Sequence, residues 1–308
     1  MGFLGECCRV WFALTLILTL LPYALYTRMI WLLLFCRCID KRRATDVNVC
    51  AGILTFRLII LLNPQIRMVL VGGKLDWEPS KQGPPAMYLM NHTSFFDFFV
   101  FTSLVPLSVI FRNHTRTLMA IKLFQMPILG KSIGDHVGSF RVYFRITDAN
   151  SNDFGVDRDK QQVREVNPTL RPGHSPLPIL TLAPDQAEVE KIQAHVESGG
   201  ALAFCPEGTL NKSPPGLQLF RKGSFGWAVS HQMQVWGLAM LGNYECWPKK
   251  CSVGGYPCTI YVDIAPLLTP EPHADPADVA GACQKRMQEM MDKLVQLKRD
   301  AGKSSTML

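Results

Sequence analysis

Two side chains whose types and spacing suit acid–base chemistry, His92 and Asp97, lie within the segment Asn-His-Thr-Ser-Phe-Phe-Asp. A histidine acts as a general base toward a hydroxyl when a carboxylate holds its second ring nitrogen and favours the imidazolium. Residues five apart on a helix point about 140° away from each other, at about 100° per residue. We therefore predict that His92 lies in a turn and that Asp97 lies in the first turns of the following helix.

The surroundings of this segment support its chemistry, because the apolar run 86–90 just before it is typical of a strand. Ligands bind at the carboxyl ends of strands in open α/β sheets. Free N–H groups at a helix start there could stabilise developing negative charge. A second pair with the same spacing, His273 and Asp278, follows no strand and lies in a proline-rich turn. We interpret Asp278 as part of a helix start and assign His273 no catalytic role.

A second motif, Cys-Pro-Glu-Gly-Thr at 205–209, also follows a short apolar run. Gly208 beside the Thr209 hydroxyl could bring backbone N–H groups close to a phosphate. Glu207 could orient a substrate hydroxyl or hold a nearby basic side chain, and Lys212 would add positive charge. The alternative interpretation is an ordinary Pro-Glu-Gly turn.

A third stretch, Phe-Arg-Val-Tyr-Phe-Arg at 140–145, alternates basic and apolar residues as a strand does. Arg141 and Arg145 share one face of that strand, because side chains repeat every two residues. Together they could bind a phosphate through paired hydrogen bonds. Alternatively, they form the solvated side of an edge strand.

The elements that must position these residues follow an alternating order, which predicts an α/β fold with a sheet flanked by helices. The strands are predicted at 67–71, 86–90, 117–121, 140–144, 201–204, 234–241 and 259–264, and helices at 95–104, 185–198 and 222–231. A polar loop is expected at about 148–184. The segment 277–299 is predicted to form an amphipathic helix with a methionine-rich face.

The N-terminal part of the chain is typical of membrane helices. The apolar run 10–39 contains one charge, Arg28, before the basic cluster that begins at Arg37, and it is long enough to span a bilayer. A second run, 49–62, is shorter and contains Arg57. We favour an interfacial hairpin over two full crossings, because arginines at mid-bilayer are costly. We thus predict a membrane anchor at 1–64 with one or two hydrophobic helices, an α/β domain at 65–270, and a C-terminal amphipathic helix and tail at 271–308.

Composition narrows the possible partners. The formal net charge is +7, and charged residues make up 19% of the chain, below the globular average of about 25%. This favours a membrane surface or phosphorylated substrates, and the lack of an arginine-rich or aromatic RNA-binding motif argues against nucleic acid. The ten cysteines form no Cys-x-x-Cys pair. We interpret them as reduced thiols and predict no metal site.

Taken in order, Asn-His-x-x-x-x-Asp, the arginine-bearing strand and Phe-x-Pro-Glu-Gly-Thr resemble the glycerolipid acyltransferase family, most closely its 1-acyl-glycerol-3-phosphate acyltransferases. The resemblance covers about residues 70–245. It implies that His92 deprotonates the acceptor hydroxyl, which attacks the thioester of acyl-coenzyme A directly, and that Asp97 orients His92. The glycerol phosphate of the lysophospholipid would be held by the second motif and an arginine, carried over as Glu207, Gly208, Thr209 and Arg141 or Arg145. Acyl-coenzyme A is then a co-substrate, and no cofactor is expected.

The sequence departs from the family at Leu210, where an arginine usually stands. Phosphate binding would then fall to Lys212 or to the two arginines. The expected activity is transfer to the sn-2 hydroxyl of 1-acyl-glycerol 3-phosphate. Another lysophospholipid or glycerol 3-phosphate stays open as acceptor, as does a non-catalytic lipid-binding role. A lipid hydrolase is disfavoured, because Lys222 replaces the first glycine of the one Gly-x-Ser-x-Gly-like segment.

The resemblance also implies a location. Enzymes of phospholipid synthesis suggest the endoplasmic reticulum membrane, and the basic cluster after the first apolar run suggests that the catalytic site faces the cytosol. The sequence contains Asn-x-Ser/Thr sequons at Asn91, Asn113 and Asn211. We expect none to carry a glycan, because two of them lie in or near the predicted site.

Overall fold

The computed structural model describes residues 2–71, 85–120, 132, 139–142 and 186–305 of the chain. Arg145 and the predicted loop at 148–184 lie outside the described residues. Within the described part, seven strands form one sheet in the order β1-β7-β6-β2-β5-β3-β4. Their bounds are β1 (Ile66–Val71), β2 (Ala86–Met90), β3 (Arg116–Ala120), β4 (Phe140–Val142), β5 (Leu202–Phe204), β6 (Gln234–Leu241) and β7 (Cys258–Leu268).

Neighbouring strands of this sheet run parallel, except for the antiparallel pair β6 and β7. All five residues of β2 are buried, which explains why its sequence reads as a continuous apolar run rather than an alternating one. Alternate side chains of β2 enter two different cores. Tyr88 and Met90 belong to one buried cluster, while Met87 and Leu89 belong to the other.

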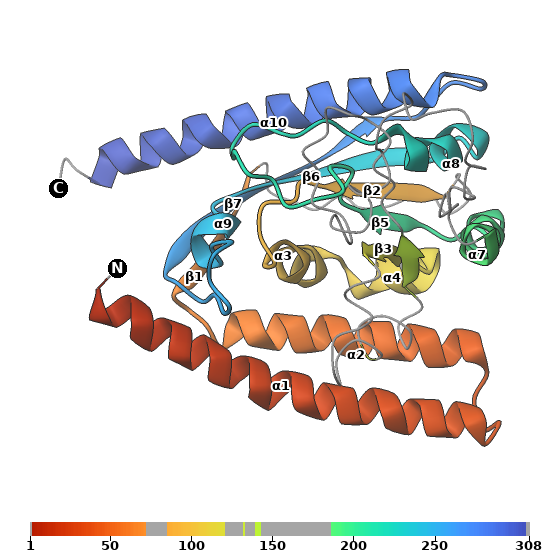
Figure 1. Cartoon of the computed structure of the whole chain (residues 1–308), viewed down its shortest axis with the longest axis horizontal. Coiled ribbons are helices and arrows are strands. Elements are labelled where there is room, and N and C mark those ends of the chain that lie inside the picture. The colour runs from red at the N-terminus through yellow and green to blue at the C-terminus, as the bar shows by residue number, and fades with distance from the viewer. Residues whose placement is uncertain (1, 72–84, 121–131, 133–138, 143–185, 306–308) are drawn as a thin grey trace, which may run out of the picture.

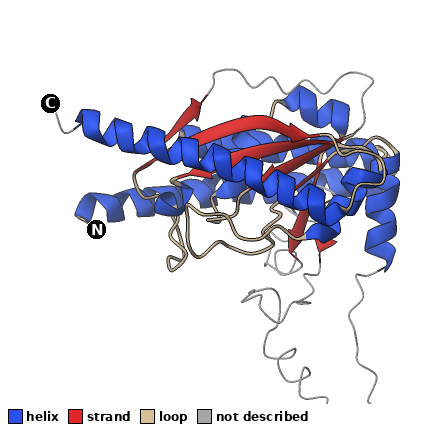
Figure 2. Ribbon diagram, turned by 90° about the horizontal axis from the view of Figure 1, so that it is seen from above, coloured by secondary structure: helices blue, strands red, loops and turns tan. Residues whose placement is uncertain are grey.

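Helices cover both faces of the sheet (Figure 1). Their bounds are α1 (Phe3–Phe35), α2 (Lys41–Leu61), α3 (Asp97–Leu104), α4 (Leu107–Asn113), α7 (Gln186–Glu197), α8 (Phe225–Ser230), α9 (Asn243–Cys246) and α10 (Pro276–Ser305). The helix α10 packs on β6, β7 and α8, and Figure 2 shows it lying over the strands. The opposite face carries α3 and α4, with α1 and α2 as a further layer (Figure 1). The predicted α/β class, with a sheet flanked by helices and two apolar N-terminal helices, is confirmed.

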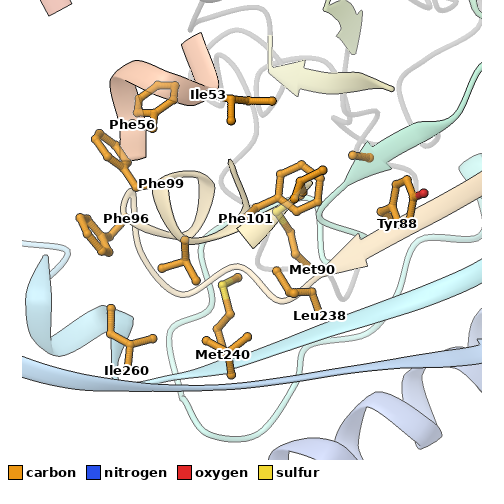
Figure 3. Packing of buried hydrophobic residues seen from close by; sticks show 14 of the residues in the cluster. Ile53, Phe56, Tyr88, Met90, Phe96, Phe99, Phe101, Leu238, Met240 and Ile260 are labelled. Atoms are coloured by element: carbon orange, nitrogen blue, oxygen red, sulfur yellow. The ribbon is translucent and has the colours of Figure 1, made fainter. Parts of the chain in front are cut away.

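The core on the α3 side joins the N-terminal helices to the sheet. Figure 3 shows Phe56 of α2 beside Phe99 of α3, with ring centroids 4.7 Å apart. Phe12 of α1 is fully buried and contacts the ring of Trp247, which follows α9, at 5.8 Å between centroids. The two N-terminal helices therefore share one hydrophobic core with the α/β sheet.

Both N-terminal helices are long and apolar enough to cross a membrane, by length and composition. Large apolar side chains of α1 remain exposed along most of its length. These are Phe3, Leu4, Val10, Trp11, Leu14, Ile17, Leu18, Leu21, Leu25, Met29, Trp31, Leu32, Leu33 and Phe35. An exposed apolar surface of this extent is typical of contact with lipid.

Arg57, the charge inside the second apolar run, points toward the protein. Its guanidinium donates to the backbone carbonyls of Ser103 at 3.2 Å and Val105 at 2.5 Å. These carbonyls lie at the C-terminal end of α3, where a positive charge is favourable. Arg57 therefore ties α2 to the helix that begins with Asp97.

We expect the substitution Arg57→Ala to lower the free energy of unfolding by about 2 kcal/mol, because two carbonyls lose a charged donor. In detergent micelles this should lower the thermal midpoint by about 4 °C. The matched control is Arg28→Ala in α1, whose side chain is exposed, and which should leave the midpoint unchanged. Equal midpoints for the two variants would contradict a role of Arg57 in holding α3.

Candidate active site

The structure places His92 in the turn that follows β2 and Asp97 at the first residue of α3. The positions predicted from their spacing are thus confirmed. His92 Nδ1 lies 2.9 Å from Asp97 Oδ2, so a proton on Nδ1 is held by the carboxylate. The other ring nitrogen, Nε2, is then the one that can exchange a proton with a substrate. The His92 side chain is 28% exposed, which leaves the ring accessible.

The Asp97 carboxylate is buried at 1% exposure and is surrounded by donors. Its Oδ2 also accepts from the backbone N–H groups of Thr93 at 2.7 Å and Ser94 at 3.0 Å. Its Oδ1 accepts a close hydrogen bond from Nδ2 of Asn243. Buried charges persist only where such partners replace water, so these bonds fix the carboxylate in front of the imidazole.

Two effects compete at His92. Burial disfavours the imidazolium, but interactions with the neighbouring Cys205 thiol and with Asp97 outweigh it and raise the pKa of His92 well above 6.5. Burial in turn raises the pKa of the Cys205 thiol. His92 is therefore a stronger base than a free imidazole, which suits removal of a proton from a hydroxyl.

Glu207 binds the two loops of the site to each other. Its Oε1 accepts from the backbone N–H of His92 at 2.7 Å, and its Oε2 accepts from that of Gln218 at 2.9 Å. The backbone N–H of Asn211 donates back to the carbonyl of His92 at 2.5 Å. Glu207 thus positions the histidine turn, and its contact with a substrate stays a prediction.

Gly208 adopts a left-handed backbone conformation with φ of +70°. A Cβ at this position would lie 2.3 Å from Nε of Arg221, so only glycine fits between the loop and this side chain. The Thr209 hydroxyl is mostly buried and donates to Oε1 of Gln218 at 3.1 Å. Lys212 is exposed.

The structure brings His92, Asp97, Glu207, Gly208 and Thr209 into one site at the ends of β2 and β5. Arg141 lies on β4, and nothing is described of its side chain. In the described part of the chain, no group of three or more His, Cys, Asp or Glu residues could hold a metal ion. The substrate-binding assignments of Arg141, Arg145 and Lys212 stay predictions.

Sequence reasoning missed two asparagines that organise the site. Asn91 is fully buried, and its amide pairs with the backbone of Met240 on β6, at 2.9 Å to the carbonyl and 2.7 Å from the N–H. Asn243 reaches Asp97 from the residue that begins α9. The buried amide of Asn91 also has no room for a glycan in the folded protein.

These elements match a known family. The model of the Acyltransferase family matches residues 75–241, which is more than half of the chain. The protein belongs to the acyltransferase family. The matched stretch contains the His92–Asp97 pair, the motif at 205–209 and the whole of β6. Membership of this family implies lipid substrates.

A solved structure shares the fold. PlsC from Thermotoga maritima, a 1-acyl-sn-glycerophosphate (LPA) acyltransferase, superimposes with a TM-score of 0.59 at 15% sequence identity. The alignment covers 94% of this chain and 95% of PlsC, so the N-terminal helices are included in the likeness. A comparison with the sequences of curated proteins gives no significant match.

Glu207 makes the stability of this family member depend on pH. Burial raises the pKa of Glu207 from 4.5 to about 7, although the N–H groups of His92 and Gln218 oppose the rise. A raised folded-state pKa favours the fold below pH 4.5, and this contribution is lost as pH rises through about 7.

Because of Glu207, the free energy of unfolding of the wild type should fall by about 3 kcal/mol between acidic and alkaline pH. We expect this fall to be absent in Glu207→Gln. The measurement is denaturant unfolding of both proteins in micelles at a series of pH values. The variant should also be less stable at acidic pH, because one amide N–H would face the side-chain NH₂. Parallel pH curves for the two proteins would show that Glu207 does not titrate in this range.

Proposed function

We propose that the protein transfers a fatty acyl group from acyl-coenzyme A to the sn-2 hydroxyl of 1-acyl-glycerol 3-phosphate, forming phosphatidate. The observation that carries this proposal is the 2.9 Å contact between His92 Nδ1 and Oδ2 of Asp97, within an acyltransferase domain. Asp97 is buried, and both of its carboxylate oxygens accept hydrogen bonds. Nε2 of His92 takes the proton of the hydroxyl, and the oxygen attacks the thioester carbonyl. The tetrahedral intermediate expels the thiolate of coenzyme A, which receives the proton from His92. No acyl-enzyme is needed.

The phosphate of the acceptor would bind near the loop of Gly208 and Thr209. Lys212 and the arginines at 141 and 145 are the predicted cations, because a dianionic head group requires positive charge. Leu210 supports a second candidate, in which the acceptor is another lysophospholipid or glycerol 3-phosphate. The apolar Leu210 side chain supplies no donor where the family usually has an arginine.

The lipid substrates would reach this site from a membrane surface. We place the protein in the endoplasmic reticulum membrane with its site facing the cytosol. The apolar exposed face of α1 supports membrane contact. The packing of Phe12 against Trp247 and of Arg9 over Tyr256 supports an interfacial helix, because the first third of α1 is bound to the same body as the site.

The first test of the activity is coenzyme A release from oleoyl-coenzyme A by the purified protein. We expect release to require lysophosphatidate and to fall about 10³-fold in His92→Ala, since general-base catalysis contributes on that scale. The matched control is His273→Ala, which changes the other His-x-x-x-x-Asp pair and should keep full activity. The wild-type rate should rise with pH as His92, whose pKa lies well above 6.5, loses its proton.

Three other results of that assay are informative. Activity with a different lysolipid alone would keep the acyl transfer and reject lysophosphatidate as the acceptor. Release that persists in His92→Ala would reject His92 as the base. Silence of the wild type with every acceptor would favour the non-catalytic lipid-binding alternative.

The orientation in the membrane can be tested with native thiols. Cys7 and Cys38 are exposed and lie near opposite ends of α1. In sealed vesicles with the cytosolic face outward, a membrane-impermeant maleimide should label both residues if α1 lies in the interface. Labelling of Cys38 alone would mean that α1 crosses the bilayer, and labelling of neither before permeabilisation would contradict a cytosolic site.

A further inference from the structure

The side-chain amide of Asn243 makes one described hydrogen bond, to Asp97. The residue is fully buried, and its Nδ2 donates to Oδ1 of Asp97. Its own Oδ1 is buried without a hydrogen-bond partner among the described residues. An asparagine that served only to hold its own loop would satisfy its carbonyl locally. This amide is instead oriented by the carboxylate behind the histidine.

The fold brings Asn243 to this place through the order of the strands. The strand β6 is the parallel neighbour of β2, with Leu238 opposite Met90, so both strands end at the same edge of the sheet. Gly242 then turns the chain with φ of +103°, where a Cβ would lie 2.4 Å from the carbonyl oxygen of Thr259. This turn directs Asn243 toward the start of α3.

A second bond fixes α9 against the histidine turn. The Ser94 hydroxyl donates to the carbonyl of Trp247, just beyond α9, at 3.0 Å. The side chain of Glu245, in the middle of α9, pairs with Lys298 of α10 and is not directed at the site. The element that carries Asn243 is thus held from both sides.

The donors to Asp97 are divided unequally between its two oxygens. Oδ2 receives His92 and the N–H groups of Thr93 and Ser94, whereas the donor described for Oδ1 is Asn243. Without that donor, a buried anionic oxygen would lose the hydrogen bond described for it. The carboxylate would then be free to rotate or to take up a proton, and either change weakens its hold on His92.

We propose that Asn243 is a positioning residue of the reaction, the third member of an Asn243–Asp97–His92 chain. Its hydrogen bond to Oδ1 stabilises the ionised carboxylate and keeps Oδ2 aimed at Nδ1. The effect on the rate rests on the proposed function, because it assumes that His92 acts as the base. The effect on the titration of His92 does not depend on any substrate.

Two substitutions separate positioning from mere packing. Asn243→Ala removes the donor at every pH, so kcat should fall about 10-fold or more at all pH values, while KM for both substrates changes less than about 3-fold. Asn243→Asp supplies a donor only while the new carboxyl is protonated. At acidic pH its rate should be close to the wild-type rate. The ratio of the two rates should fall about 10-fold as the new carboxyl ionises beside Asp97.

The other titratable groups around the chain, Cys205 and Glu207, are the same in all these proteins. The matched structural control is Asn63→Ala, which removes an equally buried amide that donates to Thr15 at 2.9 Å and to the carbonyl of Ile59 at 2.6 Å, between α1 and α2. This variant should lose stability without a change in the pH profile. If Asn243→Asp and Asn243→Ala show the same rate ratio to wild type at every pH, the positioning role is rejected.

A measurement without substrate keeps the two proposals distinct. The NMR titration of ¹³C-labelled histidines in micelles should show His92 titrating at lower pH in Asn243→Ala than in the wild type, since a rotated or protonated Asp97 stabilises the imidazolium less. Asn63→Ala should titrate like the wild type. A shifted titration in a protein that acylates no lysolipid would reject the proposed function and keep the positioning role. An unshifted titration would reject the positioning role, whatever the activity.

Discussion

A carboxylate buried away from water must find its donors within the protein, and this requirement at Asp97 organises the candidate site. Desolvating an ion costs several kcal/mol even after relaxation, and a single histidine cannot offset that cost. The donors come from the turn after β2 and from α9 after β6. Two strands that are far apart in sequence therefore have to end at the same edge of the sheet, and the parallel pairing of β2 with β6 provides that arrangement.

The turn that carries His92 is also held by buried side chains. The turn that carries His92 has no regular backbone partners, so its polar groups must be satisfied by side chains. Asn91 pairs with the backbone of Met240, and Glu207 accepts from the N–H of His92. Both side chains are buried, and each connects the turn to a different neighbouring strand end. The His-x-x-x-x-Asp and Pro-Glu-Gly-Thr motifs are consequently one structural unit.

The N-terminal helices belong to this unit as well. Phe12 packs against Trp247, and the carbonyl of Trp247 accepts from Ser94 in the turn that carries His92. Arg57 binds the far end of α3. An anchor attached only through a flexible linker would leave the distance from lipid to site variable. Direct packing instead fixes the position of His92 relative to the exposed apolar face of α1.

The local sequence signals predicted most of the fold, and they predicted the site only in part. Buried parallel strands are continuous apolar runs, so the strands were found within a few residues of their bounds. The helix α4 was not predicted, because seven residues are too few to show a helical period. His92 and Asp97 were found because both belong to one turn and the helix after it.

Asn243 belongs to a different class of residue. It meets Asp97 across 146 positions of the chain, and no spacing rule links the two. What links them is the order of strands in the sheet. There β6 lies next to β2, although β3, β4 and β5 come between them in the described part of the chain. A polar residue just after a strand that neighbours β2 is therefore a candidate only once the strand pairing is known. The burial of that residue and the partner of its side chain then distinguish a role in the site from a role in packing. For Asn243, the described partner of the buried amide is the Asp97 carboxylate.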